Sequence, residues 1–379
     1  MTLQAEPSDV NARTVQLVKV LAEVGPDVPE ISRRLKQFKE SVRYRYKEKI
    51  LNKGFAVQAI VDHEKLGLRR VIMVLDFSDD YRKYAQSILV AMSDLCFLVS
   101  FAKTMPGGYY IAHFSVPSEF VLGVTRFFET MKEKGMFKRV DVLEFDWRRI
   151  VPMKSEFYDF DTGRWDFEWG SQTNYDFGSA KYAPSVPTKF DYVDLLTMKE
   201  LQMDANKSLK EISEKLEVNY KKLAWHYTAH VLARGLFRGY SVNWMGTRYN
   251  YEIEKALHRQ HRYIGYELFA RDLTDYDVIA LRKHLNGIPF LWSEAVGKNY
   301  AAQLTFPVDC VVDGLQYLTQ AVGEIKEKVE IFTIDQMDAA GFTVPYSRFD
   351  ASRRGWTFDE SNLITRFDEL IIQIKNGTS

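Results

Sequence analysis

The sequence is poor in cysteine and has no long apolar run, and both absences exclude classes of protein. Its two cysteines, Cys96 and Cys310, lie in apolar segments far apart in the chain, which indicates reduced core residues rather than a disulfide framework or a zinc site. No apolar run reaches the length of a membrane span, and the N-terminus MTLQAEPSDV has neither a basic nor an apolar region. We therefore expect a cytoplasmic protein with no membrane partner.

The sequence also lacks the common motifs of enzymes and metal sites. No glycine-rich phosphate loop follows a strand pattern, and no Gly-x-Ser-x-Gly nucleophile elbow is present. Two close histidine pairs, His226 with His230 and His258 with His261, lack a neighbouring Cys-x-x-Cys or His-Glu-x-x-His context. We expect no metal site, no cofactor and no enzymatic activity.

What the sequence does contain is an uneven charge distribution. Lys plus Arg number 51 and Asp plus Glu also number 51, so the net charge gives no indication of nucleic-acid binding. Between residues 32 and 53, however, only Glu40 and Glu48 oppose a run of basic residues: Arg33, Arg34, Lys36, Lys39, Arg43, Arg45, Lys47, Lys49 and Lys53. Such a run is typical of a solvated helix face or of a nucleic-acid contact.

The basic run belongs to a stretch, Glu30–Gly54, that occurs again as Glu211–Gly235. Each copy has a short helix pattern, a polar break and a longer helix that ends at a glycine suited to a C-cap, which is the layout of a helix-turn-helix. At one constant offset, Glu30, Ile31, Ser32, Leu35, Tyr46, Leu51 and Gly54 match Glu211, Ile212, Ser213, Leu216, Tyr227, Leu232 and Gly235.

Each copy is followed by the order β-α-β-β-α-β, the ferredoxin-like arrangement, and this repetition indicates a tandem duplication. In the first half the later patterns span Tyr81–Met92, Phe97–Ala102, Tyr109–Val116, Phe120–Lys134 and Val140–Asp146. In the second half they span His261–Phe269, Asp277–Leu285, the hairpin FLWSEAVGKNYAAQLTFPV, Val311–Lys326 and Val329–Asp335. Further helices are expected at Asn11–Ala22 and Leu363–Ile374.

An aromatic and acidic segment follows each half: FYDFDTGRWDFEW and FDASRRGWTFDE. We expect both to dock on the sheet of their own or of the partner module. The alternative is a surface for protein contacts or ligand gating, since aromatic residues with a charged rim are common at interfaces. Gly170–Thr188, rich in Gly, Ser and Pro, is the expected linker between the halves.

These features together resemble the Lrp/AsnC (feast/famine) transcription regulators, present here twice in one chain. The segments LQMDANKSLKEISEKL and RGLFRGYSVNW of the second half are similar to the family's head and hinge strand, and KGFAVQAIVDHEKLGL of the first half resembles the same hinge. The resemblance implies an α+β fold with two tandem copies of a winged-helix-type helix-turn-helix followed by a ferredoxin-like, RAM-like module.

The predicted boundaries divide the chain into six parts. They are a first head (1–56), a first module (57–150), an aromatic segment and linker (151–188), a second head (189–240), a second module (241–340), and an aromatic segment with a C-terminal helix (341–379). The modules are expected to pair as an intramolecular pseudo-dimer or to form a homodimer.

The resemblance implies double-stranded DNA as the partner, read in the major groove by the second helix of each head. Because the two heads differ in sequence, we expect an asymmetric operator. The predicted DNA contacts are Arg33, Arg34, Lys39, Ser41, Arg43, Tyr44, Arg45 and Lys47 in the first head, and Tyr220, Lys221, Lys222 and His226 in the second.

A small-molecule effector is also implied, because the family has a Gly-x-Tyr-Asp hairpin near its effector site. The equivalent residues here are Gly107 and Tyr110 in the first module, and Gly297 and Tyr300 in the second. The acid of the motif is missing in both copies.

Two alternatives to a sequence-specific regulator remain open. The same plan resembles the sirohaem decarboxylases, in which His113, or His261 with Arg262, would surround the substrate. The other alternative is an architectural protein that binds DNA without sequence preference.

Overall fold

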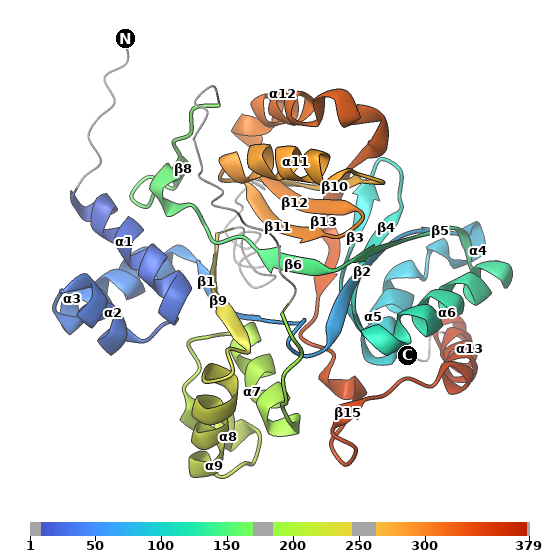
Figure 1. The fold of residues 1–379 in the computed structure, drawn as a ribbon, viewed down its shortest axis with the longest axis horizontal. Coiled ribbons are helices and arrows are strands. Elements are labelled where there is room, and N and C mark those ends of the chain that lie inside the picture. The colour runs from blue at the N-terminus through green and yellow to red at the C-terminus, as the bar shows by residue number, and fades with distance from the viewer. Residues whose placement is uncertain (1–8, 170–184, 245–262, 377–379) are drawn as a thin grey trace.

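The computed structural model describes residues 9–169, 185–244 and 263–376 and has a mixed helix and sheet, α+β, architecture. Two groups of helices lie on one side of the molecule, and a large sheet covered by further helices makes up the rest (Figure 1). Among the described residues, no helix is both long and apolar enough to span a lipid bilayer.

The first head begins with three helices, α1 (Asp9–Val24), α2 (Val28–Leu35) and α3 (Lys39–Arg45). The Asp27 side chain caps α2 by accepting a hydrogen bond from the Glu30 amide at 3.0 Å. After α3 the helix continues as a π-helix at Tyr46–Ile50. The helical segment ends at Gly54, whose φ of 85° is the left-handed conformation expected of a glycine that terminates a helix.

The second head repeats this order with α7 (Tyr192–Met203), α8 (Leu209–Lys215), α9 (Tyr220–His226) and a π-helix at Tyr227–Leu232. Ser208 caps α8 in a capping box with Glu211. The two heads share one hydrophobic core, in which Ile31 and Val42 pack in the same cluster as Ile212 and Leu223. A tandem winged-helix arrangement stays a prediction; the structure shows two three-helix groups packed together.

Strands β1 (Ala56–Val61) and β9 (Phe237–Asn243) connect the heads to the sheet. They form an antiparallel ribbon in which Val57 pairs with Val242 and both side chains are buried. The hinge of each half therefore pairs with the hinge of the other.

Both halves then follow the β-α-β-β-α-β order. The first half contains β2 (Leu68–Phe77), α4 (Asp79–Arg82), α5 (Ala85–Leu95), β3 (Leu98–Met105), β4 (Tyr110–Pro117), α6 (Val121–Glu133) and β5 (Phe137–Phe145). The second contains β10 (Tyr263–Ala270), α11 (Asp275–Gly287), β11 (Leu291–Val296), β12 (Tyr300–Pro307), α12 (Val311–Val322) and β13 (Val329–Gly341).

The two sets of strands form one nine-stranded sheet in the order β5-β2-β4-β3-β13-β10-β12-β11-β6. The halves meet where β3 pairs with β13, and again where β11 pairs with β6 (Trp147–Ile150). Only Asp146 separates β5 from β6, so the two ends of this order are adjacent in the chain. Side chains of both halves, such as Ile72 and Phe269, share a core cluster inside this arrangement.

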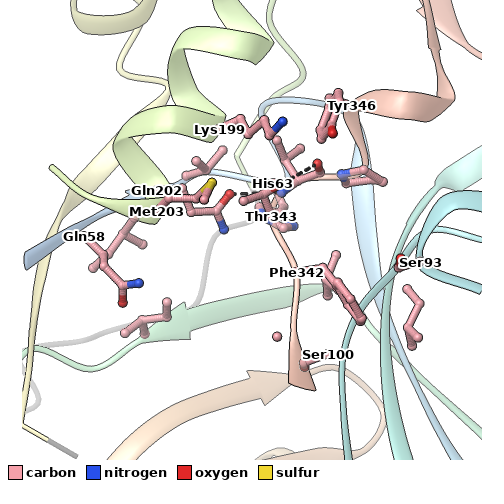
Figure 2. Close-up of a pocket in the computed structure, with 18 of the residues that line it drawn as sticks. Gln58, His63, Ser93, Ser100, Lys199, Gln202, Met203, Phe342, Thr343 and Tyr346 are labelled. Atoms are coloured by element: carbon pink, nitrogen blue, oxygen red, sulfur yellow. Dashed lines mark hydrogen bonds between the residues drawn. The ribbon is translucent and has the colours of Figure 1, made fainter. Parts of the chain in front are cut away.

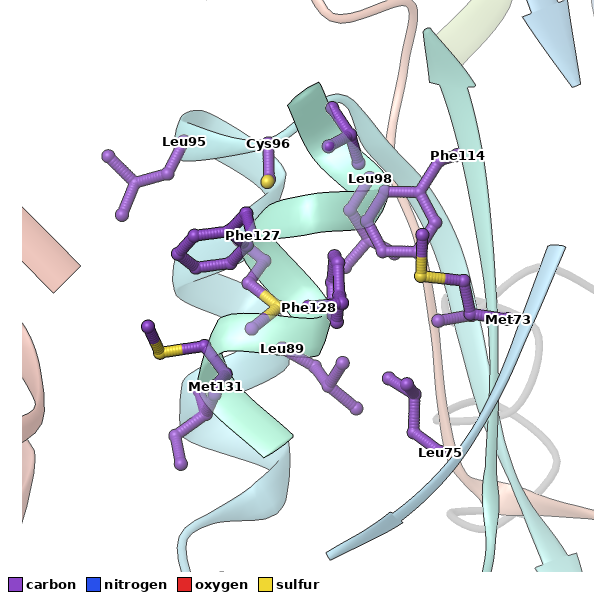
Figure 3. Packing of buried hydrophobic residues seen from close by; sticks show 14 of the residues in the cluster. Met73, Leu75, Leu89, Leu95, Cys96, Leu98, Phe114, Phe127, Phe128 and Met131 are labelled. Atoms are coloured by element: carbon purple, nitrogen blue, oxygen red, sulfur yellow. The ribbon is translucent and has the colours of Figure 1, made fainter. Parts of the chain in front are cut away.

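Helices α5 and α6 cover the first half of the sheet, and their packing is dominated by fully buried aromatic and aliphatic side chains such as Phe127, Phe128 and Leu89 (Figure 3). The C-terminal helix α13 (Glu360–Asn376) completes this cluster. It contributes one apolar side chain per turn: Leu363, Phe367, Ile371 and Ile374.

Each aromatic segment packs partly on its own half, as Phe160 does on Phe55 and Phe349 on Phe190, and also reaches the opposite half of the molecule. The first, which includes β7 (Tyr158–Asp159) and β8 (Arg164–Trp165), places Trp165 and Trp169 against Phe290 of the second module. The second, which includes β14 (Phe349–Asp350) and β15 (Gly355–Trp356), places Phe358 against Phe97 and Phe120 of the first. The halves are thus joined through these aromatic segments as well as in the sheet.

Candidate functional site

A cavity, which we call the main cavity, lies where the hinge ribbon, the sheet and the second head meet. Its volume is about 590 Å³, and its walls come from β1, the start of β3, β6, α7 and residues 341–347 after β13. Figure 2 shows Gln202 and Lys199 of α7 facing Thr343 and Tyr346 across this space. The Gln202 amide oxygen accepts a hydrogen bond of 2.9 Å from the Val344 amide, which ties α7 to the segment after β13.

Cationic side chains dominate the charged lining of this cavity. Arg70, Arg148 and Lys199 line it together with the imidazole of His63, while Asp94 is the acidic residue among the lining side chains. The Lys199 ammonium lies over the Tyr346 ring, 4.0 Å from its centroid. This lining favours an anionic ligand.

Arg70 is the most unusual of these groups. Its side chain is only 6% exposed, and its Nε has no hydrogen-bond partner among the described residues. Buried polar groups are nearly always hydrogen-bonded, so an orphaned guanidinium nitrogen in a cavity wall indicates a position prepared for a ligand or water. Arg70 also lines a second, much smaller cavity of about 10 Å³ together with Glu267.

The electrostatics of the cavity follow from the crowding of like charges. Burial, together with the Arg148 charge, lowers the pKa of Arg70 well below its usual value. Burial and the neighbouring Arg238 charge lower the pKa of Arg148 to about 10, so this guanidinium remains charged at neutral pH. An anion that enters the cavity would relieve the repulsion between these groups.

His63 experiences the same field. Burial and the charges of Arg70, Arg148 and Arg238 lower its pKa well below the ordinary value of 6.5, so the imidazole is neutral at pH 7. Its Nδ1 lies 2.7 Å from the Ser115 hydroxyl, which fixes the ring orientation. A bound carboxylate would oppose the arginine charges and raise this pKa.

Arg238, on β9, lies near Arg70, Arg148 and His63 but is itself paired with acidic side chains. Burial lowers its pKa, but hydrogen bonds and attraction from Asp62 and Glu64 outweigh this and raise the pKa above its usual value. The Arg238 Nε lies 2.9 Å from Asp62 Oδ2. This ion pair holds the second hinge strand against the turn that carries His63.

The duplication does not repeat the cationic pair. Strand register aligns Arg70 of β2 with Gly265 of β10, because they lie opposite Ser115 and Thr305 at equivalent places in the two hairpins. By the same register, Arg148 aligns with Met337. The duplicated positions in the second half therefore carry no charge.

Sequence reasoning missed Arg70, Arg148 and Lys199 as site residues. Two arginine pairs gave a signal, since Arg69–Arg70 and Arg148–Arg149 interrupt strands that are otherwise largely apolar. A buried arginine in such a strand needs a partner or a ligand.

The predicted DNA contacts of the first head lie mostly on its surface, but several carry acidic partners. Arg33 and Arg34 both bind Glu30, and Arg43 binds Glu40. Lys39, Ser41, Tyr44 and Lys47 are exposed, whereas Arg45 is half-buried and donates to the Gln37 side chain at 2.7 Å.

In the second head, three of the four predicted DNA-contact residues are exposed and one is buried. Tyr220, Lys221 and Lys222 are exposed at the start of α9, as expected. His226 is not: its side chain is 5% exposed and its Nδ1 lies 3.0 Å from Asp194 of α7. The expectation that His226 faces the surface is wrong, because the helix turns this side chain toward the carboxylates of α7. Trp225, in contrast, is 57% exposed.

The residues expected at an effector site lie away from the main cavity. Gly107 and Gly297 occupy the turns before β4 and β12. The Tyr110 hydroxyl donates to Asp338 at 3.1 Å, and the Tyr300 hydroxyl donates to Glu294 at 3.0 Å. Both tyrosine hydroxyls thus have an acidic partner: Tyr110 in the second half of the chain, and Tyr300 on the neighbouring strand β11.

The residues considered for the decarboxylase alternative also differ in placement. His113 is buried, with its Nε2 3.0 Å from Glu267, and lines the small cavity with Arg70. His261 and Arg262 lie outside the described residues.

Comparisons with known proteins reveal a fold shared over nearly the full length. The crystal structure of the siroheme decarboxylase NirDL matches with a TM-score of 0.52 at 11% identity, covering 96% of this chain and 99% of that chain. The same enzyme with an iron-uroporphyrin III analogue matches with a TM-score of 0.51 at 11% identity, covering 95% and 98%. No family model and no curated protein sequence matches the chain.

Shorter regulators match only part of the chain. A transcriptional regulatory protein of the AsnC family from Pyrococcus furiosus is 17% identical and has a TM-score of 0.27; the match covers 36% of this chain and 87% of that chain. The expectation of no enzymatic activity is contradicted, because the fold that matches over nearly the whole length is that of the siroheme decarboxylase NirDL, an enzyme.

Proposed function

We propose that this protein is a decarboxylase that acts on a siroheme-like, carboxylate-bearing tetrapyrrole in the main cavity. The observation that carries the proposal is the buried Arg70, whose Nε has no hydrogen-bond partner among the described residues, beside Arg148 and His63 in a cavity of about 590 Å³. The likeness in fold to the siroheme decarboxylase supports the choice of reaction and substrate class.

The size and charge of the cavity suit such a substrate. Its volume falls within the range of about 300–1,000 Å³ typical of ligand pockets. A tetrapyrrole with several carboxylates offers anionic groups to Arg70, Arg148 and Lys199, and arginine binds a carboxylate through two parallel hydrogen bonds. Phe342, Met203 and Trp292 supply apolar surface in the same wall for a macrocycle.

Decarboxylation breaks a carbon–carbon bond, leaves the electron pair on the substrate carbon and releases CO₂, so that carbon must then receive a proton. His63 is the group that we assign to proton donation. It is neutral in the free protein, and a bound carboxylate would favour its protonated form by opposing the neighbouring arginines. Arg70 and Arg148 orient the carboxylates that are retained.

The test is turnover of siroheme by the purified protein, followed by mass spectrometry for loss of CO₂ and by binding of iron-uroporphyrin III. Replacing Arg70 with Met should lower kcat/KM by about 10- to 100-fold, because a hydrogen bond to a charged group contributes about 1.5–3 kcal/mol. Arg43→Met, in the exposed part of α3, is the matched control and should leave turnover unchanged. Unaltered turnover in Arg70→Met, or no turnover of siroheme by the parent protein, would reject the proposal.

DNA binding by the heads is a second candidate function, and the exposed basic and aromatic side chains of α3 favour it. Lys39, Arg43 and Tyr44 project from this helix into solvent. Gel shifts against genomic fragments would test it, with Arg43→Met expected to weaken binding and Arg70→Met expected to have no effect. The two variants thus separate the two functions.

A further inference from the structure

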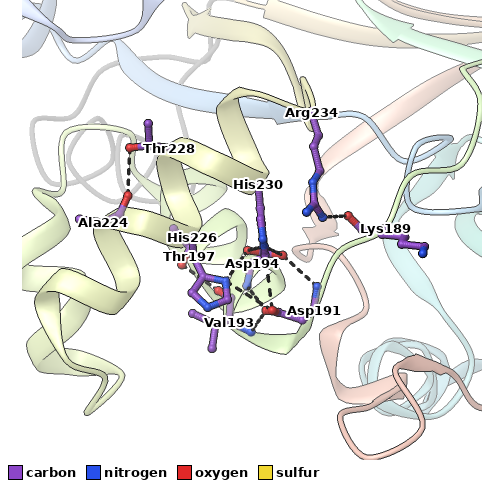
Figure 4. Close-up of polar contacts among 10 residues, drawn as sticks. All are labelled: Lys189, Asp191, Val193, Asp194, Thr197, Ala224, His226, Thr228, His230 and Arg234. Carbon is purple, nitrogen blue, oxygen red and sulfur yellow. Dashed lines mark hydrogen bonds and ion pairs between the residues drawn. The ribbon is translucent and has the colours of Figure 1, made fainter.

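Four metal-binding side chains converge inside the second head. Figure 4 shows His226 and His230, from α9 and the π-helix that follows it, facing Asp191 and Asp194 at the start of α7. One ligand atom from each residue lies within 4.8 Å of every other. We propose that these residues form a structural zinc site that clamps α7 to α9.

The distances match the geometry of a tetrahedral ion. The His226 Nδ1 lies 3.0 Å from Asp194 Oδ1 and 3.4 Å from Asp191 Oδ2. The His230 Nδ1 lies 3.1 Å from Asp194 Oδ1 and 4.0 Å from Asp191 Oδ2. Zinc with bonds of about 2.0–2.1 Å to four tetrahedral ligands separates neighbouring ligand atoms by about 3.3 Å. Small side-chain rotations would bring these four atoms to that spacing.

The carboxylates are oriented by the backbone. Asp191 caps α7, and its Oδ1 accepts hydrogen bonds from the amides of Val193 and Asp194 at 2.9 and 3.1 Å. Asp194 Oδ2 accepts a hydrogen bond of 2.9 Å from the Asp191 amide. Asp191 thus uses Oδ1 in the capping box and directs Oδ2 toward the histidines, whereas Asp194 directs both oxygens toward them: Oδ1 lies near both rings and Oδ2 lies 2.9 Å from His230 Nδ1. Outer contacts of this kind orient metal ligands.

The charge of the cluster also favours a divalent cation. The Asp194 side chain is fully buried, and the ion pairs of Asp191 and Asp194 within the described part of the chain involve only the two histidines. The two carboxylates bring two negative charges, and the charge of the fully buried Asp194 is costly unless a cation balances it. One Zn²⁺ would neutralise the set.

Ligand type and number indicate zinc in a structural role. Two imidazole nitrogens and two carboxylate oxygens are zinc ligands, and four protein ligands leave no open position for a substrate. The first head cannot hold such an ion, because the constant offset aligns His226 and His230 with Arg45 and Lys49. The site would belong to the second head alone.

The first experiment measures metal on the full-length protein. Elemental analysis after dialysis against trace zinc should give about one zinc per chain, and removal by a chelator should lower Tm by about 3 °C or more, restored by zinc. Cobalt added to the chelator-treated protein should give the intense visible bands of tetrahedral Co²⁺. Absence of bound zinc and of a cobalt spectrum in the parent protein would overturn the proposal, since a hydrogen-bonded His–Asp cluster predicts both absences.

Variants identify the ligands. His230→Gln should weaken zinc binding by more than the roughly 10- to 100-fold that loss of an outer contact costs. His284→Gln, at an exposed histidine of α11, is the matched control and should retain zinc. His230→Cys should retain cobalt and add a thiolate-to-cobalt charge-transfer band, which reports direct coordination even if His230→Gln folds poorly. Retained zinc in a folded His230→Gln, or a cobalt complex of His230→Cys without that band, would contradict the assignment.

Discussion

At the scale of single residues, the protein contains buried charged side chains whose polar atoms all have partners and others, such as Arg70, in which a polar atom has none among the described residues. Glu294 is 1% exposed and binds Arg282, Arg149 and the Tyr300 hydroxyl, so its charge is fully compensated. Arg70 is almost as deeply buried, yet its Nε is unpartnered. The compensated charge of Glu294 stabilises the second module. The unpartnered nitrogen of Arg70 is the kind of group expected at a binding site.

Replacing Glu294 with Gln should destabilise the protein by about 3–5 kcal/mol at pH 7, because Arg282 would remain buried without its counter-charge. Burial raises the pKa of Glu294, but Arg282, Arg149 and Tyr300 lower it below the usual 4.5. The stabilisation is therefore complete above pH 4.5 and is lost as the pH falls through the lowered value. Urea unfolding at several pH values should show the difference between parent and variant shrinking below pH 4.5; a pH-independent difference would argue against this ion pair as the cause.

His63 should give the decarboxylation reaction its pH dependence. The free protein holds the pKa of His63 well below 6.5, so the donor form becomes more populated as the pH falls below 7. We expect kcat/KM to rise toward acid pH in the parent protein and to lose this limb in His63→Gln, while binding of iron-uroporphyrin III changes little. An identical pH profile in the variant would assign the proton to another group.

At the scale of secondary-structure elements, the sequence predicted local segments well and their partners poorly. The helix expected at Phe120–Lys134 is α6 (Val121–Glu133), and the strand expected at Tyr109–Val116 is β4 (Tyr110–Pro117). Hydrophobic periodicity determines such segments locally. The cavity is different: Arg70, Arg148 and Lys199 come from β2, β6 and α7, and no local pattern indicates that these elements meet.

The C-terminal helix α13 should contribute strongly to stability. Phe367 is fully buried against Phe127, with ring centroids 5.2 Å apart. Phe367→Ala should therefore cost about 3–5 kcal/mol, through lost contacts and the cavity that it leaves. Ile372, 60% exposed on the same helix, is the control, and its replacement by Ala should change stability by less than about 0.5 kcal/mol in urea unfolding. Equal effects of the two changes would show that α13 does not dock as described.

At the scale of the whole molecule, the two halves are joined in the hinges, in the sheet and at the aromatic segments. The hinges pair as β1 with β9, the sheets join through β3 with β13 and β11 with β6, and each aromatic segment docks on the opposite module. The repeated sequence indicated a duplication, but the pairing partner of each strand depends on contacts between residues far apart in the chain, such as Thr104 with Ile334. Sequence patterns do not specify such long-range register.

A chain cut between residues 170 and 184, which lie outside the described residues, should therefore remain one particle. The halves would stay joined by three strand pairings, β1 with β9, β3 with β13 and β6 with β11, and by the aromatic contacts between the halves. Halves produced together from separate reading frames should co-purify at a one-to-one ratio and elute at the size of the intact protein. Separation of the halves without denaturant would contradict the strand pairings and aromatic contacts that join them.

The pairing of β3 with β13 also affects the newly made chain on the ribosome. Residues 98–105 of β3 are completed long before residues 329–341 of β13, so one edge of β3 has no partner while most of the second half is still being translated. Unpaired strand edges promote aggregation, and this edge of β3 stays unpaired while more than half of the protein is synthesised. Slow translation or an early stop codon would thus leave an aggregation-prone first half. We expect the yield of folded protein to depend more strongly on chaperones that bind nascent chains than it does for a single domain of the size of one half.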